Sequence, residues 1–120
     1  MRQKQMNLIS NIESYKHKYA KILLRFWLLD EFLSVRLEEK VIMNGMIAFI
    51  PDVTCYTENE QIIYEVSHKH ELDQYKLNLM QWYYWNMEIP VRVYEISAEW
   101  ILSQIKKPTR IKAIKMIDFI

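Results

Sequence analysis

The sequence predicts an α/β domain with a mixed β-sheet of about four strands flanked by helices, in the order αβββαβα. Three observations predict this class. Apolar residues recur at helical spacing before residue 30, extended runs lie on both sides of Asn44-Gly45, and a helical segment separates the third extended run from the fourth. Because a helix crosses over between those last two strands, the sheet is expected to be mixed.

The first helix is expected at about residues 11 to 30. Ser10 and Glu13 have the spacing of a capping box, in which two side chains satisfy free amides at a helix start. Larger apolar residues then recur close to the helical period, at Ile12, Tyr15, Tyr19, Ile22, Leu23, Phe26 and Leu29. Residues 1–10 are therefore expected to form a flexible N-terminus.

Three strands of a meander are expected next. The run from Val35 to Ile42 alternates between two sides, and Asn44-Gly45 is a strong hairpin signal because both residues tolerate positive φ. Met46 to Thr54 is the expected partner strand, and Gln61 to Ser67 is the expected third strand.

The rest of the chain is predicted as helix, strand and helix: Glu71 to Asn86, Val91 to Ile96, and a last helix capped by Ser97 that runs through Lys106. Residues 109–120 form a C-terminal arm whose structure is left open as strand, helix or oligomerisation element. The whole chain, 1–120, is expected to be a single domain.

Composition predicts a cytoplasmic domain without a membrane partner. Cys55 is the single cysteine, so no internal disulfide forms, and a reducing compartment is the natural setting. The strongly apolar stretch from Ile22 to Leu29 is interrupted by Arg25 and is too short to cross a bilayer. The net charge of +1 gives no support for nucleic-acid binding, so any such function depends on a local site.

Asp52 and Glu65 are the residues most indicative of chemistry. Asp52 follows Pro51 near the end of the second predicted strand, and Glu65 lies near the end of the third. Pairing of these strands would bring the carboxylates together. Two such carboxylates can hold a hard divalent cation, which activates water and stabilises the transition state of phosphodiester hydrolysis.

Four segments extend this pattern: Glu13-Ser-Tyr-Lys-His17-Lys-Tyr-Ala-Lys21, Ile50-Pro51-Asp52-Val53, Tyr64-Glu65-Val66-Ser67-His68-Lys69-His70-Glu71-Leu72-Asp73 with Lys76, and Val93-Tyr94-Glu95-Ile96-Ser97. Together they resemble the PD-(D/E)xK nuclease superfamily, in particular its CoiA-like competence protein branch, over roughly residues 13 to 97. The resemblance implies a restriction-endonuclease-like core. It also implies Asp52, Glu65 and Val66 as ligands of Mg²⁺ or Mn²⁺, with Glu13 as an outer ligand.

The chain departs from the family pattern at Ser67, where the motif has a lysine two residues after the glutamate. That lysine would orient the attacking water and offset phosphate charge, which a serine hydroxyl cannot do electrostatically. Lys69, on the same side of an extended strand as Glu65, and Lys76, on the following helix, are the two candidates to replace it.

Other residues have ordinary interpretations beside functional ones. His17, His68 and His70 match no zinc spacing and are interpreted as solvated or as supporting residues. The aromatic run from Trp82 to Trp85 suits core and interface more than base stacking. Lys18, Lys21 and Arg25 share one face of the first helix and would contact phosphates or form a solvated face.

Two functions of different classes follow. The first is a metal-dependent DNA endonuclease or exonuclease-like protein, using Asp52, Glu65, Lys69 or Lys76, and Glu13, with DNA as substrate. The second is a catalytically inactive nuclease-fold protein that binds DNA or protein, as in a mobile element. Ser67 leaves open whether the chain is an enzyme, and a homodimer is expected only by analogy with enzymes that cut duplex DNA.

Overall fold

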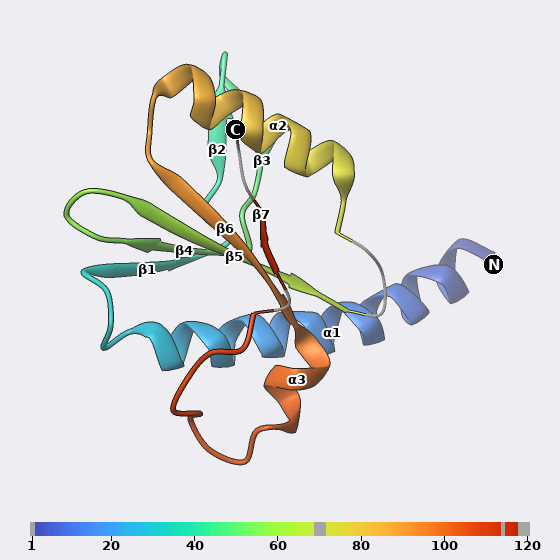
Figure 1. The fold of residues 1–120 in the computed structure, drawn as a ribbon. Helices are drawn as coiled ribbons and strands as arrows, with labels where there is room; N and C mark the ends of the chain where they lie inside the picture. The colour runs from blue at the N-terminus through green and yellow to red at the C-terminus, as the bar shows by residue number, and fades with distance from the viewer. Residues whose placement is uncertain (1, 69–71, 114, 118–120) are drawn as a thin grey trace.

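A computed structural model describes residues 2–68, 72–113 and 115–117, with side chains excluded for residues 2–14 and 115. Its main feature is a mixed five-stranded sheet with helices on both faces (Figure 1). In spatial order the strands are β1 (Ser34–Leu37), β4 (Val53–Tyr56), β5 (Gln61–Ser67), β6 (Val91–Ser97) and β7 (Lys115–Ile117). β5 and β6 are parallel and the other neighbours antiparallel, which confirms the predicted α/β class and mixed sheet.

Each face of the sheet has its own core. On one face, α1 (Arg2–Leu28) and α3 (Ala98–Ser103) pack on apolar side chains of β1, β4, β5 and β6. On the other, α2 (Gln74–Met87) packs on Ile63 and Val93, together with a separate hairpin of β2 (Val41–Met43) and β3 (Met46–Phe49). Among the described residues, no helix is long and apolar enough to cross a membrane.

The first helix is longer than the sequence predicts. It begins at Arg2, so the capping box of Ser10 and Glu13 lies inside the helix, and residues 2–10 are helical. No glycine or proline interrupts this segment, so a helix can continue through it. The apolar positions used to predict the helix are also largely the exposed ones, because the face buried against the sheet carries Ala20, Leu24, Trp27 and Leu28.

The predicted hairpin is confirmed at its turn but not as two unbroken strands. Asn44 and Gly45 have φ of 52° and 77°, as the Asn-Gly signal predicts. The first arm breaks at Glu38, whose φ of 51° is incompatible with an extended strand. The second arm breaks at Pro51, which has no N–H for a strand ladder. The outer half of the hairpin therefore leaves the main sheet, and Asp52 directly precedes β4.

The C-terminal half follows the prediction with shifted ends. β5 has the predicted bounds. α2 begins three residues later than expected, because Asp73 caps its start by accepting hydrogen bonds from the amides of Tyr75 and Lys76. α3 ends at Ser103 instead of running through Lys106. In the C-terminal arm, residues 109–120, for which the sequence indicates no single structure, β7 pairs antiparallel with β6. The main sheet is therefore one strand larger than predicted.

Candidate metal centre

Asp52 and Glu65 are paired across neighbouring strands, as the sequence predicts. The amide of Asp52 donates to Glu65 Oε2 at 3.1 Å, and the amide of Val66 donates to Asp52 Oδ2 at 2.8 Å. The two residues are only 8% and 2% exposed. Backbone donors thus hold two carboxyl groups in the interior, where charged groups need strong compensation.

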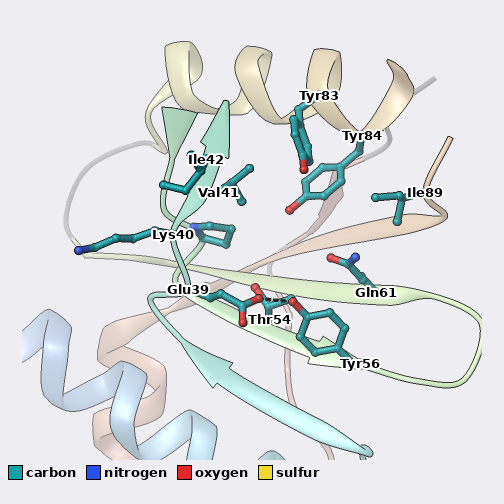
Figure 2. Close-up of a pocket in the computed structure, with 11 residues that line it drawn as sticks. Glu39, Lys40, Val41, Ile42, Thr54, Tyr56, Gln61, Tyr83, Tyr84 and Ile89 are labelled. Carbon is teal, nitrogen blue, oxygen red and sulfur yellow. Dashed lines mark hydrogen bonds between the residues drawn. The ribbon is translucent and has the colours of Figure 1, made fainter. Parts of the chain in front are cut away.

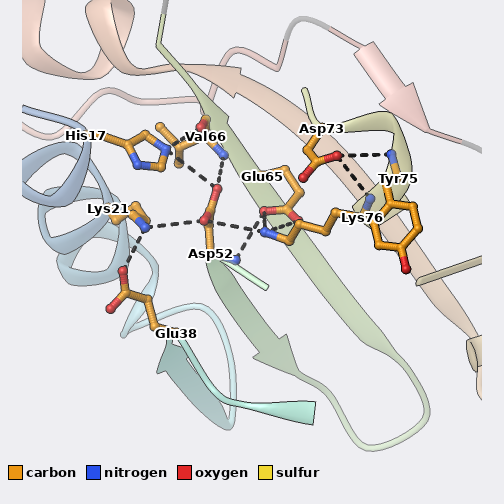
Figure 3. A network of polar contacts seen from close by, with 9 residues as sticks. All are labelled: His17, Lys21, Glu38, Asp52, Glu65, Val66, Asp73, Tyr75 and Lys76. Carbon is orange, nitrogen blue, oxygen red and sulfur yellow. Dashed lines mark hydrogen bonds and ion pairs between the residues drawn. The ribbon is translucent and has the colours of Figure 1, made fainter. Parts of the chain in front are cut away.

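Two lysines from opposite sides of the sheet supply this compensation (Figure 3). From α2, Lys76 Nζ lies 2.9 Å from Glu65 Oε1 and 3.8 Å from Asp52 Oδ1. From α1, Lys21 Nζ lies 3.3 Å from Asp52 Oδ1 and 2.7 Å from Glu38 Oε1. Burial works against the charge of Lys21, but Asp52 and Glu38 outweigh it and raise its pKa. The site therefore contains three carboxylates and two ammonium groups.

Lys21 is a site residue that the sequence interpretation missed, and His17 takes the supporting position that was one of the two roles expected for it. Lys21 is buried, which excludes the solvated face or phosphate-contacting role expected for it. His17 lies one helical turn before it, and its Nε2 is 2.5 Å from the carbonyl oxygen of Val66 and 3.8 Å from Asp52 Oδ2. The four-residue spacing of His17 and Lys21 was the available signal, because such residues share one helix face.

The two carboxyl groups have opposite pKa shifts. Burial acts to raise the pKa of Asp52, but Lys76, the hydrogen bond with Glu65, Lys21 and the Val66 amide together lower it. Burial, followed by the charge of Asp52, raises the pKa of Glu65 to about 8, against the opposing effect of Lys76. Near neutral pH the pair therefore shares a proton unless a further cation is present.

A cavity of about 260 Å³ opens on this cluster. Its lining includes Asp52, Glu65, Val66, Ser67 and Lys76. The motif position occupied by Ser67 and the lysine from α2 therefore reach the same space. Asp73 also lines this cavity, where its side chain caps α2.

The donor chemistry fits a hard divalent cation. Within the part of the chain that the structure describes, no three His, Cys, Asp or Glu side chains lie close enough together to hold a metal ion. Asp52 and Glu65 carry hard oxygen donors of the kind that Mg²⁺ and Mn²⁺ take with several waters, and the carbonyl oxygen of Val66, next to Glu65 in the chain, is in contact with His17 Nε2. Glu65 Oε1 is buried and accepts no well-formed hydrogen bond from a described residue, although Lys76 Nζ is close.

Two predicted site residues are not placed. Lys69 lies outside the described residues. Glu13 lies in the part of α1 whose side chains are not described, although its backbone is helical. Of the predicted set, the structure therefore brings together Asp52, Glu65, Val66 and Lys76.

A second cavity, of about 330 Å³, lies between the β2–β3 hairpin, α2 and the main sheet (Figure 2). Tyr83 and Tyr84 form one wall, and the Tyr56 hydroxyl donates to Glu39 on another. Arg36 Nη1 lies 3.6 Å from the second carboxylate oxygen of Glu39. Among the described residues, Glu39 is the one carboxylate that lines this cavity, whereas Asp52, Glu65 and Asp73 line the other, so this cavity offers a cation fewer carboxylate oxygen donors.

No family model matches the sequence, and no curated protein matches it. A solved structure titled "Crystal structure of SSO0001" aligns at 14% identity and a TM-score of 0.47, covering 98% of this chain and 58% of that one. The chain thus spans less than two thirds of that protein's length. A likeness at this level supports no inference about activity.

Proposed function

We propose that this chain is a metal-dependent nuclease with a restriction-endonuclease-like core, hydrolysing phosphodiester bonds in DNA with Mg²⁺ or Mn²⁺. The observation that carries the proposal is the meeting of Asp52, Glu65, Val66 and Lys76 at one cavity. The resemblance of four segments to the PD-(D/E)xK superfamily supports the proposal, and Asp52 and Glu65 occupy the positions that the resemblance implies for the motif's Asp and Glu.

The roles of the residues follow from their positions. Asp52 and Glu65, with the Val66 carbonyl, would hold the cation. When bound, the cation lowers the pKa of a water molecule bound to it and neutralises charge on the phosphate. Lys76 would donate to the attacking water or to a phosphate oxygen, because its ammonium group lies beside both carboxylates. Lys21 is a positioning residue that fixes Asp52 from α1.

Lys76 is the better of the two candidates to replace the motif lysine. It lines the same cavity as Ser67, and its Nζ already forms an ion pair with Glu65. A lysine needs only to reach the reacting atoms, so the element that carries it can differ. A serine at the motif position is therefore compatible with catalysis in this proposal.

The charge balance also supports a cation and an anionic substrate. With Glu65 ionised, the three carboxylates exceed the two ammonium groups by one negative charge. A divalent cation would reverse this balance to one positive charge, which a phosphodiester would neutralise. The raised pKa of Glu65 is consistent with a buried carboxylate that lacks such a cation.

Calorimetric titration of Mn²⁺ and Mg²⁺ into the protein tests the metal centre. We expect wild type to bind a cation and Glu65→Gln, which keeps the side-chain shape but removes the charge, to lose most of that affinity. Glu60→Gln, a change outside the site, is the matched control and should bind as wild type does. Equal affinity in wild type and Glu65→Gln would reject the assignment.

The second candidate is an inactive nuclease-fold protein that binds nucleic acid. It is favoured by an exposed stripe on α2, where Tyr75, Trp82 and Trp85 are 74%, 55% and 66% exposed. Aromatic rings on a surface can stack on unpaired bases. A protein of this kind would bind single-stranded DNA without cutting it in Mg²⁺ or Mn²⁺, and Trp82→Ala/Trp85→Ala would weaken that binding. Metal-dependent cutting that Asp52→Asn abolishes would exclude an inactive protein.

A further inference from the structure

α1 carries a second apolar stripe on the side opposite to its buried face. Four large apolar side chains of the helix are between 47% and 73% exposed there, Tyr15, Tyr19, Ile22 and Phe26, and Leu29 and Leu33, beyond the end of the helix, are 41% and 74% exposed. At about 3.6 residues per turn, the helical members of this set point away from Ala20, Leu24, Trp27 and Leu28. A helix that packs on one sheet needs one apolar face, so the fold does not account for the second.

The spacing of this outer stripe is that of a paired helix. From Tyr15 to Leu33 the intervals alternate between four and three residues without interruption, and the sequence continues the pattern back to Ile12 and Leu8. Such a pattern corresponds to the a and d positions of a heptad repeat, whose average period matches helices that wind around each other. α1 itself ends at Leu28, so helical geometry places the members up to Phe26 on the stripe, and Leu29 and Leu33 lie in the loop that follows.

We propose that the outer stripe of α1 pairs in parallel with the same stripe of a second copy of this chain. The residues that flank the stripe select this orientation. In a parallel pair, Lys18 faces the apolar Leu23, and Arg25 lies toward Asp30, just beyond the end of the helix, of the other copy, so no like charges meet. In an antiparallel pair, Lys18 of each copy faces Arg25 of the other, which brings like charges together.

Burial of the stripe would supply a substantial part of the area of a standard dimer interface. Complete burial of an aromatic side chain removes about 150–250 Å². Given their measured exposures, Tyr15, Tyr19 and Phe26 would bury on the order of 400 Å² per copy. The aliphatic members add to this, against roughly 800 Å² per partner in a standard interface. The pairing is independent of the nuclease proposal, because the candidate metal centre lies on the inner side of α1.

Sedimentation equilibrium tests the pairing. We expect wild type at twice the chain mass of 14.7 kDa and Tyr19→Lys/Phe26→Lys at the single-chain mass. The matched control is Tyr75→Lys/Trp85→Lys, which changes two comparably exposed aromatic residues on α2 and should stay at twice the mass. Circular dichroism of each variant checks that it is folded. Wild type at the single-chain mass at its highest attainable concentration would overturn the proposal.

Cysteine crosslinking tests the orientation without disrupting the stripe. Tyr15→Cys in a Cys55→Ala background should crosslink with itself, because a parallel pair brings equivalent residues within the Cα separation of about 4.4–6.8 Å that a disulfide needs. In the antiparallel arrangement Tyr15 lies opposite Phe26, and the two cysteines would be about 16 Å apart. Crosslinking only between Tyr15→Cys and Phe26→Cys chains would reject the parallel arrangement.

Discussion

The main-chain amide of Asp52 donates a hydrogen bond to Glu65 Oε2, so backbone geometry holds the two buried carboxyl groups together. In the reciprocal contact, the amide of Val66 donates a hydrogen bond to Asp52 Oδ2. Both donors belong to or adjoin paired strands, which are among the most rigid parts of a fold. The backbone therefore fixes the relative position of the two carboxyl groups.

Replacing Asp52 with alanine should destabilise the protein. The change removes one of the two carboxylates within 3.3 Å of buried Lys21, and breaking a buried ion pair from one side costs about 3 kcal/mol. Urea denaturation measures this loss. Glu58→Ala removes an exposed glutamate and should change the free energy of unfolding by only about 0.5 kcal/mol or less. Equal losses in the two variants would mean that Asp52 is not an anchor for Lys21.

Stability should decrease with rising pH because of Glu65. The folded pKa is about 8 and the ordinary pKa is 4.5, so between these values the folded state binds more protons than the unfolded state. The free energy of unfolding therefore falls as pH rises through this window. Urea denaturation of wild type and Glu65→Gln from pH 5 to pH 8.5 isolates the effect, because glutamine does not titrate. A wild-type-minus-variant difference that stays constant with pH would contradict it.

Lys76→Ala should separate catalysis from cation binding. The ammonium group lies 2.9 Å from Glu65 Oε1, so its removal eliminates a competing positive charge, and Mn²⁺ affinity should be retained or increased. DNA hydrolysis should nevertheless fall about 100-fold or more, as expected for loss of a group that assists proton transfer or charge stabilisation. Lys69→Ala is the companion variant and should keep activity. The reverse pattern would assign the motif role to Lys69.

Gly45→Ala should destabilise the hairpin for a purely backbone reason. Gly45 has φ of 77°, and no heavy atom lies within 4 Å of an added Cβ, so alanine meets a strained conformation without a clash. The expected loss in the free energy of unfolding is about 1–2 kcal/mol. Asn44→Gly, at the neighbouring positive φ, should have little effect. Thermal or urea unfolding distinguishes the two, and no loss in Gly45→Ala would contradict the turn geometry.

Short sequence motifs and strand patterns predicted the turn, one strand and the pairing of the two buried acidic residues. The Asn44-Gly45 turn, the bounds of β5 and the meeting of Asp52 with Glu65 follow from turn preference and strand pairing. The breaks at Glu38 and Pro51 were not predicted, because alternating apolar residues continue across both. Pro51 was a sequence signal for the second break, because proline cannot donate to a strand ladder. No residue type in the sequence indicated that Glu38 would adopt a left-handed conformation.

Which residues of α1 belong to the site is decided by the face of the helix that packs on the sheet, and the sequence did not predict that face. Both faces are apolar, and the sequence pattern emphasised Tyr15, Tyr19 and Phe26, which the structure places outside. With the opposite face inward, His17 and Lys21 reach Asp52. Periodicity alone cannot choose between two apolar faces, since that choice is made by tertiary packing.

Cleavage of labelled single-stranded and duplex DNA by wild type and Asp52→Asn, in Mn²⁺ and in excess chelator, tests the central claim most directly. Asparagine keeps an oxygen that can accept the Val66 amide but removes the charge beside Lys21, so circular dichroism first checks that the variant is folded. The nuclease proposal predicts cutting by wild type that requires the metal and is lost in Asp52→Asn. No cutting of either DNA form by wild type, or equal cutting by Asp52→Asn, would contradict it.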